Sequence, residues 1–286
     1  MRIFLGLLFM LLTGCGEERE MKVDIALGGS VNGFIKSSPV EISSDCSERL
    51  QLCFHEFDFP SSAKSLPTVS VHHGLGVLSL DHVVGMNIFE NFEWMEGKIK
   101  SVDLTLRGVP SRSDVPVAKG FAYSVIQKIL DAGWTRYIPT YDPRIPGGES
   151  KKTLRCEKLF TQNISSHPCF DPVYEMSDEQ WWNVSMFYYW RFYKDGSYLT
   201  LKAWRSRGEK DPVRHASYLF TLEFESEQKF WLSSFEGKDR LKWKELLPAL
   251  LEKYQASRKK LEDEAERAGI AIDRTYQDPP IAALQQ

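Results

Sequence analysis

The stretch FYYWRFYKDGSYLTLKAW, residues 187–204, decides the fold, because Asp195-Gly196 separates two runs of aromatic and β-branched residues. Asp-Gly is the preferred pair for a two-residue type I′ turn, since both of its positions need positive φ. Such a turn fixes the register of the two flanking strands. The sequence therefore predicts an antiparallel hairpin with these facing pairs: Lys194 and Ser197, Phe192 and Leu199, and Trp190 and Leu201.

The predicted hairpin has two unlike faces. The apolar face is expected to be core and carries Met186, Tyr188, Trp190, Phe192, Leu199, Leu201 and Ala203. The opposite face is the candidate binding face and carries Phe187, Tyr189, Arg191, Tyr193, Tyr198, Lys202 and Trp204. Tyr, Trp and Arg are enriched in protein interfaces, and aromatic rings also stack on sugars. Alternatively, the C-terminal helix or the N-terminal half of the chain covers this face and buries it.

Further elements extend from the hairpin in both directions. Residues 216–225 and 98–107 alternate apolar and polar side chains and predict strands. A helix is expected over 115–132, capped by Ser113 or Asp114 and ended by Gly133, with a return to the sheet at 134–138. Residues 239–268 have apolar side chains at helical spacing, and Pro248 either kinks this helix or opens a second one. The predicted class is α+β, with an antiparallel sheet, one helix near 115–132 and a long C-terminal helix.

The N-terminal part also has extended patterns. Residues 23–27 and 31–35 flank a Gly-Gly-Ser turn and predict a hairpin. Residues 50–59 and 69–84 are expected to be extended as well. The whole chain then divides into a signal peptide (1–14), a tether (15–20), an N-terminal α+β region (21–138), a connector rich in proline (139–180), a region of hairpin and helix (181–270) and a loose tail (271–286). The connector is either a linker between domains or an insertion into a continuous sheet.

Four cysteines lie beyond the first fifteen residues: Cys46, Cys53, Cys156 and Cys169. An even number in an exported chain predicts disulfides, and three pairings are open. Proximity in sequence favours Cys46 with Cys53 and Cys156 with Cys169. A zinc site made of the same residues lacks the CxxC spacing that is typical of such sites.

The start of the chain is a targeting signal. Arg2 precedes an apolar run from Ile3 to Leu12, which is the length of a secretory h-region and too short to cross a bilayer. Leu12-Thr13-Gly14-Cys15 follows and resembles the lipobox of bacterial lipoproteins. The resemblance implies cleavage before Cys15 and acylation of its thiol and its new amine, so the membrane is a partner through lipid. In this family an Asp after the cysteine favours the inner membrane. Gly16 stands here, so we expect an outer-membrane anchor facing the periplasm, with the inner membrane as the alternative.

Composition and motifs exclude several functions. The formal charge of −3 becomes −4 once Arg2 leaves with the signal, which gives no reason to expect nucleic acid as a partner. His72, His73, Asp81 and His82 lie close in sequence but lack the spacing of a zinc protease. Asp81-His82 could form a catalytic dyad, although no nucleophile motif accompanies it. No phosphate-binding loop is present. Together, the histidine spacing, the missing nucleophile motif and the missing loop predict no metal, no catalytic residue and no cofactor.

The sequence therefore favours a non-catalytic lipoprotein that binds a protein partner. Immunity proteins against toxins delivered by competing bacteria share this profile of export signal, disulfides and missing catalytic motif. Envelope-assembly or carbohydrate-binding lipoproteins that use the aromatic hairpin face form a second class. A hydrolase built around Asp81-His82 is the third.

Overall fold

The computed structural model describes residues 21–153, 156, 158–160, 162–207 and 214–285. The strands are β1 (Lys22–Ala26), β2 (Ser43–Ser47), β3 (Leu52–Asp58), β4 (Thr68–His73), β5 (Gly76–Leu80), β6 (Val83–Asn91), β7 (Ser101–Leu106), β8 (Thr135–Arg136), β9 (Lys158–Leu159), β10 (Gln162–Asn163), β11 (Phe187–Lys194), β12 (Ser197–Arg207) and β13 (Ala216–Ser226). The α-helices are α1 (Val31–Ser37), α2 (Val115–Asp131), α3 (Asp178–Asn183), α4 (Glu227–Leu232) and α5 (Trp243–Arg267). The α+β class is confirmed.

One eight-stranded sheet runs through the described residues in the order β2-β3-β6-β7-β13-β12-β11-β8, and every neighbouring pair is antiparallel. Strands from both predicted regions, 21–138 and 181–270, belong to it. The edge strand β8 pairs with β11, although some fifty residues separate them in sequence. Residues 137–186 are therefore an excursion that leaves this sheet at one edge and returns to the neighbouring strand.

The hairpin of β11 and β12 has the predicted turn and register. Asp195 and Gly196 have φ of 45° and 76°, as a type I′ turn requires. All three predicted pairs are present, and Phe187 lies opposite Trp204. Of the seven side chains expected in the core, six are buried. Met186 is the exception, because it precedes β11 and is 44% exposed.

The helix α2 has its predicted boundaries, and α5 ends where expected but begins at Trp243, after a 3-10 helix over Gly237–Lys242. The carboxylate of Asp114 accepts a hydrogen bond from the backbone amide of Val117 and caps α2, and Gly133 follows it with a φ of 84°. The helix α5 continues through Pro248 without a break and is followed by Gly269 at a φ of 75°. Only glycine adopts such angles without steric cost, which explains both stops.

The expected hairpin of residues 23–27 and 31–35 is wrong. Residues 31–37 form the helix α1. Ser30 caps its start, because the Ser30 hydroxyl accepts a hydrogen bond from the backbone amide of Gly33 at 3.1 Å. Val31 and Phe34 are three residues apart, so both lie on one side of a short helix and both are buried there. The strand β1 then pairs in parallel with β4 rather than with its sequence neighbour.

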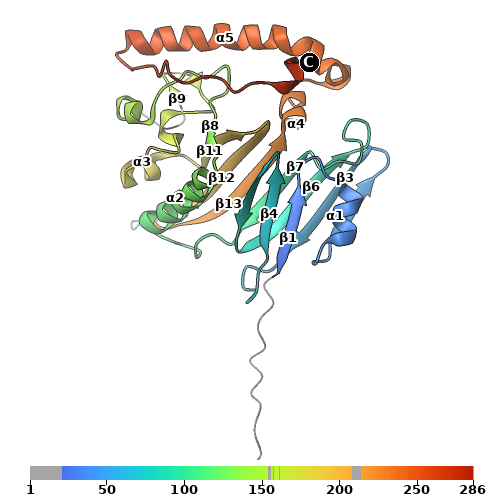
Figure 1. The fold of residues 1–286 in the computed structure, drawn as a ribbon. Coiled ribbons are helices and arrows are strands. Elements are labelled where there is room, and N and C mark those ends of the chain that lie inside the picture. The colour runs from blue at the N-terminus through green and yellow to red at the C-terminus, as the bar shows by residue number, and fades with distance from the viewer. Residues whose placement is uncertain (1–20, 154–155, 157, 161, 208–213, 286) are drawn as a thin grey trace, which may run out of the picture.

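The core lies between the large sheet and the elements that cover one of its faces. Figure 1 shows α2 over β12 and β13, and the small sheet β1-β4-β5 over β6 and β7. Phe121 of α2 contacts Phe220 of β13 with ring centroids 4.8 Å apart. Val23, Val69 and Leu104 are fully buried in the same cluster. Both covering layers thus share one continuous core.

The C-terminal elements gather at one end of the large sheet. Figure 1 shows α5 lying across this end, with α4 beneath it and the final segment running back along α5. Residues 271–285, expected to be a loose tail, are instead held in place. The Tyr276 hydroxyl accepts a hydrogen bond from the backbone amide of Ile138 at 2.9 Å, and Asp278 forms an ion pair with Arg258.

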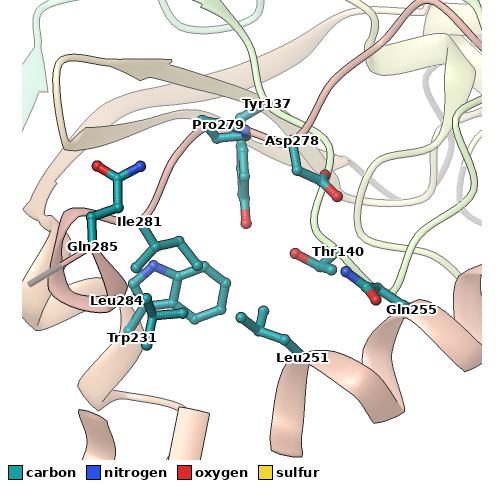
Figure 2. A pocket seen from close by; sticks show the side chains of 10 residues that line it. All are labelled: Tyr137, Thr140, Trp231, Leu251, Gln255, Asp278, Pro279, Ile281, Leu284 and Gln285. Carbon is teal, nitrogen blue, oxygen red and sulfur yellow. The ribbon is translucent and has the colours of Figure 1, made fainter. Parts of the chain in front are cut away.

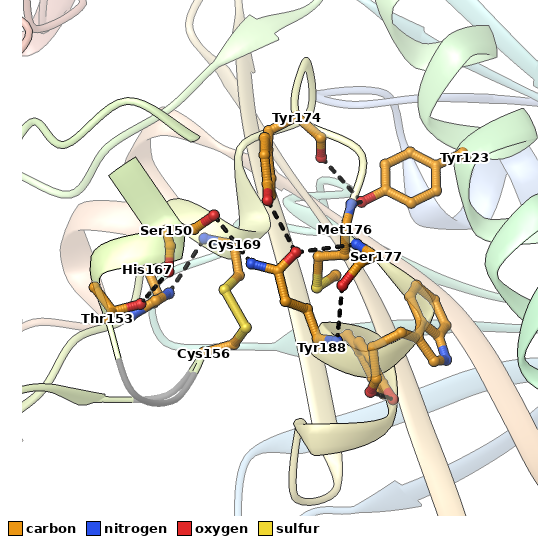
Figure 3. Close-up of a disulfide and its surroundings, with 12 residues drawn as sticks. Tyr123, Ser150, Thr153, Cys156, His167, Cys169, Tyr174, Met176, Ser177 and Tyr188 are labelled. Carbon is orange, nitrogen blue, oxygen red and sulfur yellow. Dashed lines mark hydrogen bonds between the residues drawn. A yellow bond between two sulfur atoms is a disulfide. The ribbon is translucent and has the colours of Figure 1, made fainter. Parts of the chain in front are cut away.

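Two disulfides join the cysteines that proximity favoured, Cys46 with Cys53 and Cys156 with Cys169. The first links facing residues of β2 and β3. The second lies inside the excursion, beside a hydrogen-bond network that Figure 3 shows. There the side chain of Gln180 accepts from Tyr174 at 2.9 Å and donates to Ser150 at 3.2 Å. The connector is thus fixed by side-chain bonds and a cross-link rather than by long regular elements.

The strand β1 begins at the end of the molecule opposite α5, as Figure 1 shows. The strand β12 starts near α4 and runs towards that same end, and Trp204 belongs to its second half. In the part of the chain that the structure describes, no helix combines the length and apolarity needed to cross a membrane. Residues 1–20, with the predicted signal, Cys15 and the tether, lie outside the described residues.

Candidate functional site

The structure divides the candidate binding face of the hairpin into a covered part and an open part. Tyr198 is only 2% exposed, and Tyr193 is half-buried. At the other end of the hairpin, Phe187 and Trp204 are 45% and 42% exposed. The alternative that this face is buried therefore applies to one end of it only.

Aromatic packing closes the covered part. The rings of Tyr198 and Phe230 stack with centroids 3.7 Å apart and an interplanar angle of 6°. The Trp231 indole donates to the Tyr198 hydroxyl at 3.1 Å, and the Tyr193 hydroxyl donates to the carbonyl of Pro280 at 3.3 Å. Burial raises the pKa of Tyr198 far above its ordinary value. Tyr193 and Tyr198 thus hold α4 and the C-terminal segment on the sheet and are not free to bind a partner.

The open part contains a row of three exposed apolar side chains on adjacent strands. Phe187 of β11 lies opposite Trp204 of β12, which lies opposite Leu219 of β13. Leu219 is 43% exposed, like its two neighbours. We call Phe187, Trp204 and Leu219 the apolar row. Leu219 was missed from sequence because the outward residues of its strand are otherwise polar, although the register with Trp204 would have placed it there.

The next residues of the same face are charged or amphipathic. Tyr189 stacks on Phe187 with ring centroids 6.0 Å apart. Lys202 lies opposite Tyr189 and forms an ion pair with Glu223 at 2.5 Å. Because both partners of this pair are about a third exposed, its contribution to stability is small. The apolar row therefore has a polar rim on the side towards the sheet centre, as protein interfaces commonly do.

A pocket of about 410 Å³ opens beside the apolar row, between β11 and the excursion. Its apolar wall includes Phe170, Phe187 and Tyr189, and its polar groups include Asn163, Ser185 and Arg191. The excursion thus adds a side wall to the sheet face. This volume lies in the range of small-ligand pockets. Asn163, Phe170 and Ser185 had no sequence signal, because only the return of the excursion to β11 brings them to the hairpin.

The residues of the suggested dyad do not form a catalytic arrangement with each other. The carboxylate of Asp81 accepts hydrogen bonds from Lys128 at 2.5 Å and Thr68 at 3.1 Å. These bonds lower the pKa of Asp81, with Lys128 as the largest cause. His82 is exposed at a φ of 57°. Asp81 therefore stabilises the contact of β5 with α2.

His72 and His73 point to opposite sides of β4, as the alternation of a strand requires. His72 is exposed and bonds to Asp24 at 2.9 Å. His73 is buried against the Trp134 ring, with centroids 4.4 Å apart. Burial, assisted by the nearby Lys194 ammonium, lowers the pKa of His73 to about 4. These two histidines therefore do not share a metal site.

Two other clusters have the residue types of metal sites. Cys156, His167 and Cys169 lie together, as do Cys53, His55 and Glu90, with ligand atoms within 4.8 Å of each other in each group. All these cysteines are in disulfides, whose sulfur atoms cannot serve as thiolate ligands. In the second group His55 bonds instead to Glu90 at 3.0 Å. The cysteines of both clusters, and the pair of His55 with Glu90, thus form structural contacts.

A second cavity of about 250 Å³ lies between α5 and the C-terminal segment. Figure 2 shows Trp231, Leu251, Ile281 and Leu284 around it, with Tyr137 at its far side. Most of these residues belong to the cluster that attaches α4 and α5 to the sheet. The cavity therefore belongs to this packing junction, and the open pocket beside the apolar row is the better candidate site.

Comparisons of the chain with protein-family models, with curated proteins and with solved structures yield no match.

Proposed function

We propose that the protein is a lipid-anchored binding protein of the bacterial envelope, without catalytic activity, which receives a protein partner on the apolar row. The observation that carries this proposal is the alignment of Phe187, Trp204 and Leu219 on three adjacent strands, each more than 40% exposed. Contiguous exposed apolar side chains are uncommon on monomeric proteins and mark interaction sites. A Trp in such a surface, here Trp204, is typical of the residues that dominate binding energy.

Two further features support the proposal. The lipobox resemblance at Cys15 supports membrane anchoring, because two or three acyl chains bind a bilayer far better than one. The bonds of Asp81 to Lys128 and Thr68 support a non-catalytic role, since they engage the only acid of the suggested dyad. The finer form of the proposal is an immunity protein that binds an incoming toxin. It is supported by the sequence profile alone.

Anchoring is tested by metabolic labelling with an alkyne fatty acid and membrane fractionation. We expect label and membrane association in the wild type and loss of both in Cys15→Ala. A wild-type protein that carries no label and fractionates with soluble material would overturn the lipid anchor. The disulfides of the remaining cysteines provide an internal control, because they offer no thiol for acylation.

Partner binding is tested by a photo-crosslinking residue placed at position 204 or 219 in living cells. Position 117 is the matched control, because Val117 is similarly exposed but lies on α2, over the opposite sheet face. We expect one protein adduct from positions 204 and 219 and its absence at 117. The adduct from position 204 should be lost when Phe187→Ser is combined with Leu219→Ser. Adducts to lipid alone, or equal protein adducts from all three positions, would contradict binding of a protein partner at the apolar row.

The immunity role has its own test. Deletion of the gene should harm cells only when a competitor delivers the toxin, and the apolar-row variants should fail to protect although they fold. A growth or envelope defect in the absence of any competitor would instead indicate an assembly function.

A further inference from the structure

The pocket beside the apolar row contains a cationic group that is not neutralised by an ion pair. Arg191 lines this pocket and is half-buried. Three other shielded arginines, Arg136, Arg144 and Arg258, each bind a carboxylate at 2.7–2.8 Å. Among the described residues, Arg191 has no carboxylate within ion-pair distance. It differs from these three, and also from the buried Arg205, which has no carboxylate partner in the described part of the chain but donates to the carbonyls of Trp181, Trp182 and Val184.

The contacts of Arg191 leave much of its binding capacity unused. Its Nε donates to the carbonyl of Ser165 at 3.4 Å, and its Nη1 donates to the Thr200 hydroxyl at 3.4 Å. Both distances are at the long end for hydrogen bonds, and both acceptors are neutral. Guanidinium has five N–H donors in a planar fork that fits a carboxylate with two parallel bonds.

Asp142 is the nearby acid that feels the charge of Arg191, but it is engaged elsewhere. Its carboxylate accepts a hydrogen bond from the backbone amide of Ser166 at 2.6 Å, and the residue is only 2% exposed. It does not line the pocket. The pocket therefore offers positive charge to an incoming group.

The walls of the pocket select what can accompany that group. Phe170, Phe187 and Tyr189 give it an apolar side, and the Arg191 guanidinium lies 5.9 Å from the centre of the Tyr189 ring. A cation over an aromatic face is held in place and partly desolvated, which strengthens its attraction for an anion. Asn163 and Ser185 add neutral polar groups beside it. A carboxylate next to an apolar group matches this combination.

We infer that this pocket binds a carboxylate carried beside an apolar group, and that the protein partner supplies it as an acidic side chain flanked by apolar residues. The inference rests on the proposed function, because Phe187 belongs both to the pocket wall and to the apolar row. A partner that covers the row would therefore reach the pocket in the same interface. Arg191 would then act as the group that selects acidic over neutral residues at this position.

The probes for the test are 3-phenylpropionate and its neutral analogue 3-phenylpropanamide, titrated into the folded mature protein and followed by NMR of the backbone amides of Ser165 and Ser185, which line the pocket and are present in every variant. We expect saturable binding of the acid at millimolar concentration and at least tenfold weaker binding of the amide. Arg191→Gln should remove this preference, and Arg191→Lys should retain part of it. Arg49→Gln is the matched control, because Arg49 is an exposed arginine on the turn between β2 and β3.

The outcomes separate this inference from the proposed function. Equal binding of acid and amide, or an unchanged preference in Arg191→Gln, would overturn the carboxylate pocket even if position 204 crosslinks a protein. Loss of the protein adduct in Arg191→Gln, with retention in Arg49→Gln, would support the acidic partner. Carboxylate binding without any protein adduct at 204 or 219 would overturn the partner as its source and identify a small-molecule site.

Discussion

Arg258 and Asp278 form a bidentate ion pair, with hydrogen bonds of 2.7 and 2.9 Å, that joins the middle of α5 to the C-terminal segment. The same guanidinium donates to the carbonyls of Asp142 and Pro139 at 2.9 Å. One nearly buried side chain therefore connects α5, the C-terminal segment and the start of the excursion. The start of the excursion is thereby joined to elements more than a hundred residues later in the chain.

We expect Asp278→Ala to lower the free energy of unfolding by about 2 kcal/mol, because it leaves the Arg258 charge shielded without its partner. The estimate is below the usual range for buried pairs since Asp278 is a third exposed. Urea denaturation measures it. Asp263→Ala breaks the exposed pair with Lys259 and should cost about 0.5 kcal/mol or less. Equal losses in the two variants would contradict this account.

Arg205 is only 1% exposed. It donates hydrogen bonds to the backbone carbonyls of Trp181, Trp182 and Val184, at the C-terminal end of α3. Replacing it with Met should cost about 3 kcal/mol, because several buried carbonyls lose their donor. Arg214→Met is the control, since its pair with Glu179 is exposed. A melting temperature that falls equally in both variants would argue against the buried cap.

His73 should make the protein less stable in acid. Its pKa is about 4 in the fold and 6.5 when unfolded, so between these values the unfolded chain takes up a proton that the folded chain does not. Stability contributed by neutral His73 is therefore lost as the pH falls below about 6.5. In His73→Phe, the slope of unfolding free energy against pH should decrease by up to about 1.4 kcal/mol per unit. An unchanged slope in His73→Phe would contradict this account.

Asp142 should act in the opposite direction. Burial raises the pKa of its carboxyl to about 6, so the folded chain holds a proton that the unfolded chain releases above pH 3.8. The stability from the protonated form is present below that value and is lost as the pH rises through 6. We expect Asp142→Asn to stabilise the protein more at pH 7.5 than at pH 5. A difference of the reverse sign would show that its arginine neighbours dominate over burial.

The second disulfide should support the pocket as well as the fold. Cys156→Ala with Cys169→Ala removes a 13-residue cross-link and should cost about 3 kcal/mol. Phe170 adjoins Cys169 and lines the pocket, so binding of 3-phenylpropionate should weaken too. Cys46→Ala with Cys53→Ala, far from the pocket in the sheet order, should lower stability but leave binding intact.

The parts of the fold that the sequence predicted are those set by local rules. The Asp195-Gly196 turn, the Asp114 cap and the glycine stops act over a few residues, and the structure has each of them. The segment 31–37 was misread because its short apolar pattern fits both a strand and a helix, and the Ser30 cap decides between them. The parallel pairing of β1 with β4 is non-local and left no sign in either strand.

The candidate site was predicted in part for the same reason. Hairpin register placed Phe187 opposite Trp204, but it could not show that α4 and the C-terminal segment cover Tyr193 and Tyr198. The pocket needed the return of the excursion to β11, which brings Ser165 within reach of Arg191. Contacts across more than twenty residues depend on tertiary packing, which a local pattern does not encode.

The position of β1 has a consequence for how the molecule would stand on a bilayer. Only residues 16–21 separate Cys15 from this strand, and six residues reach at most about 20 Å. If acyl chains hold Cys15 in a leaflet, the start of β1 is kept within about this distance of the lipid, while α5, at the opposite end of the molecule, points away. A partner would then bind in the layer of water next to the membrane, because the anchor restricts diffusion of this protein to the plane of the bilayer.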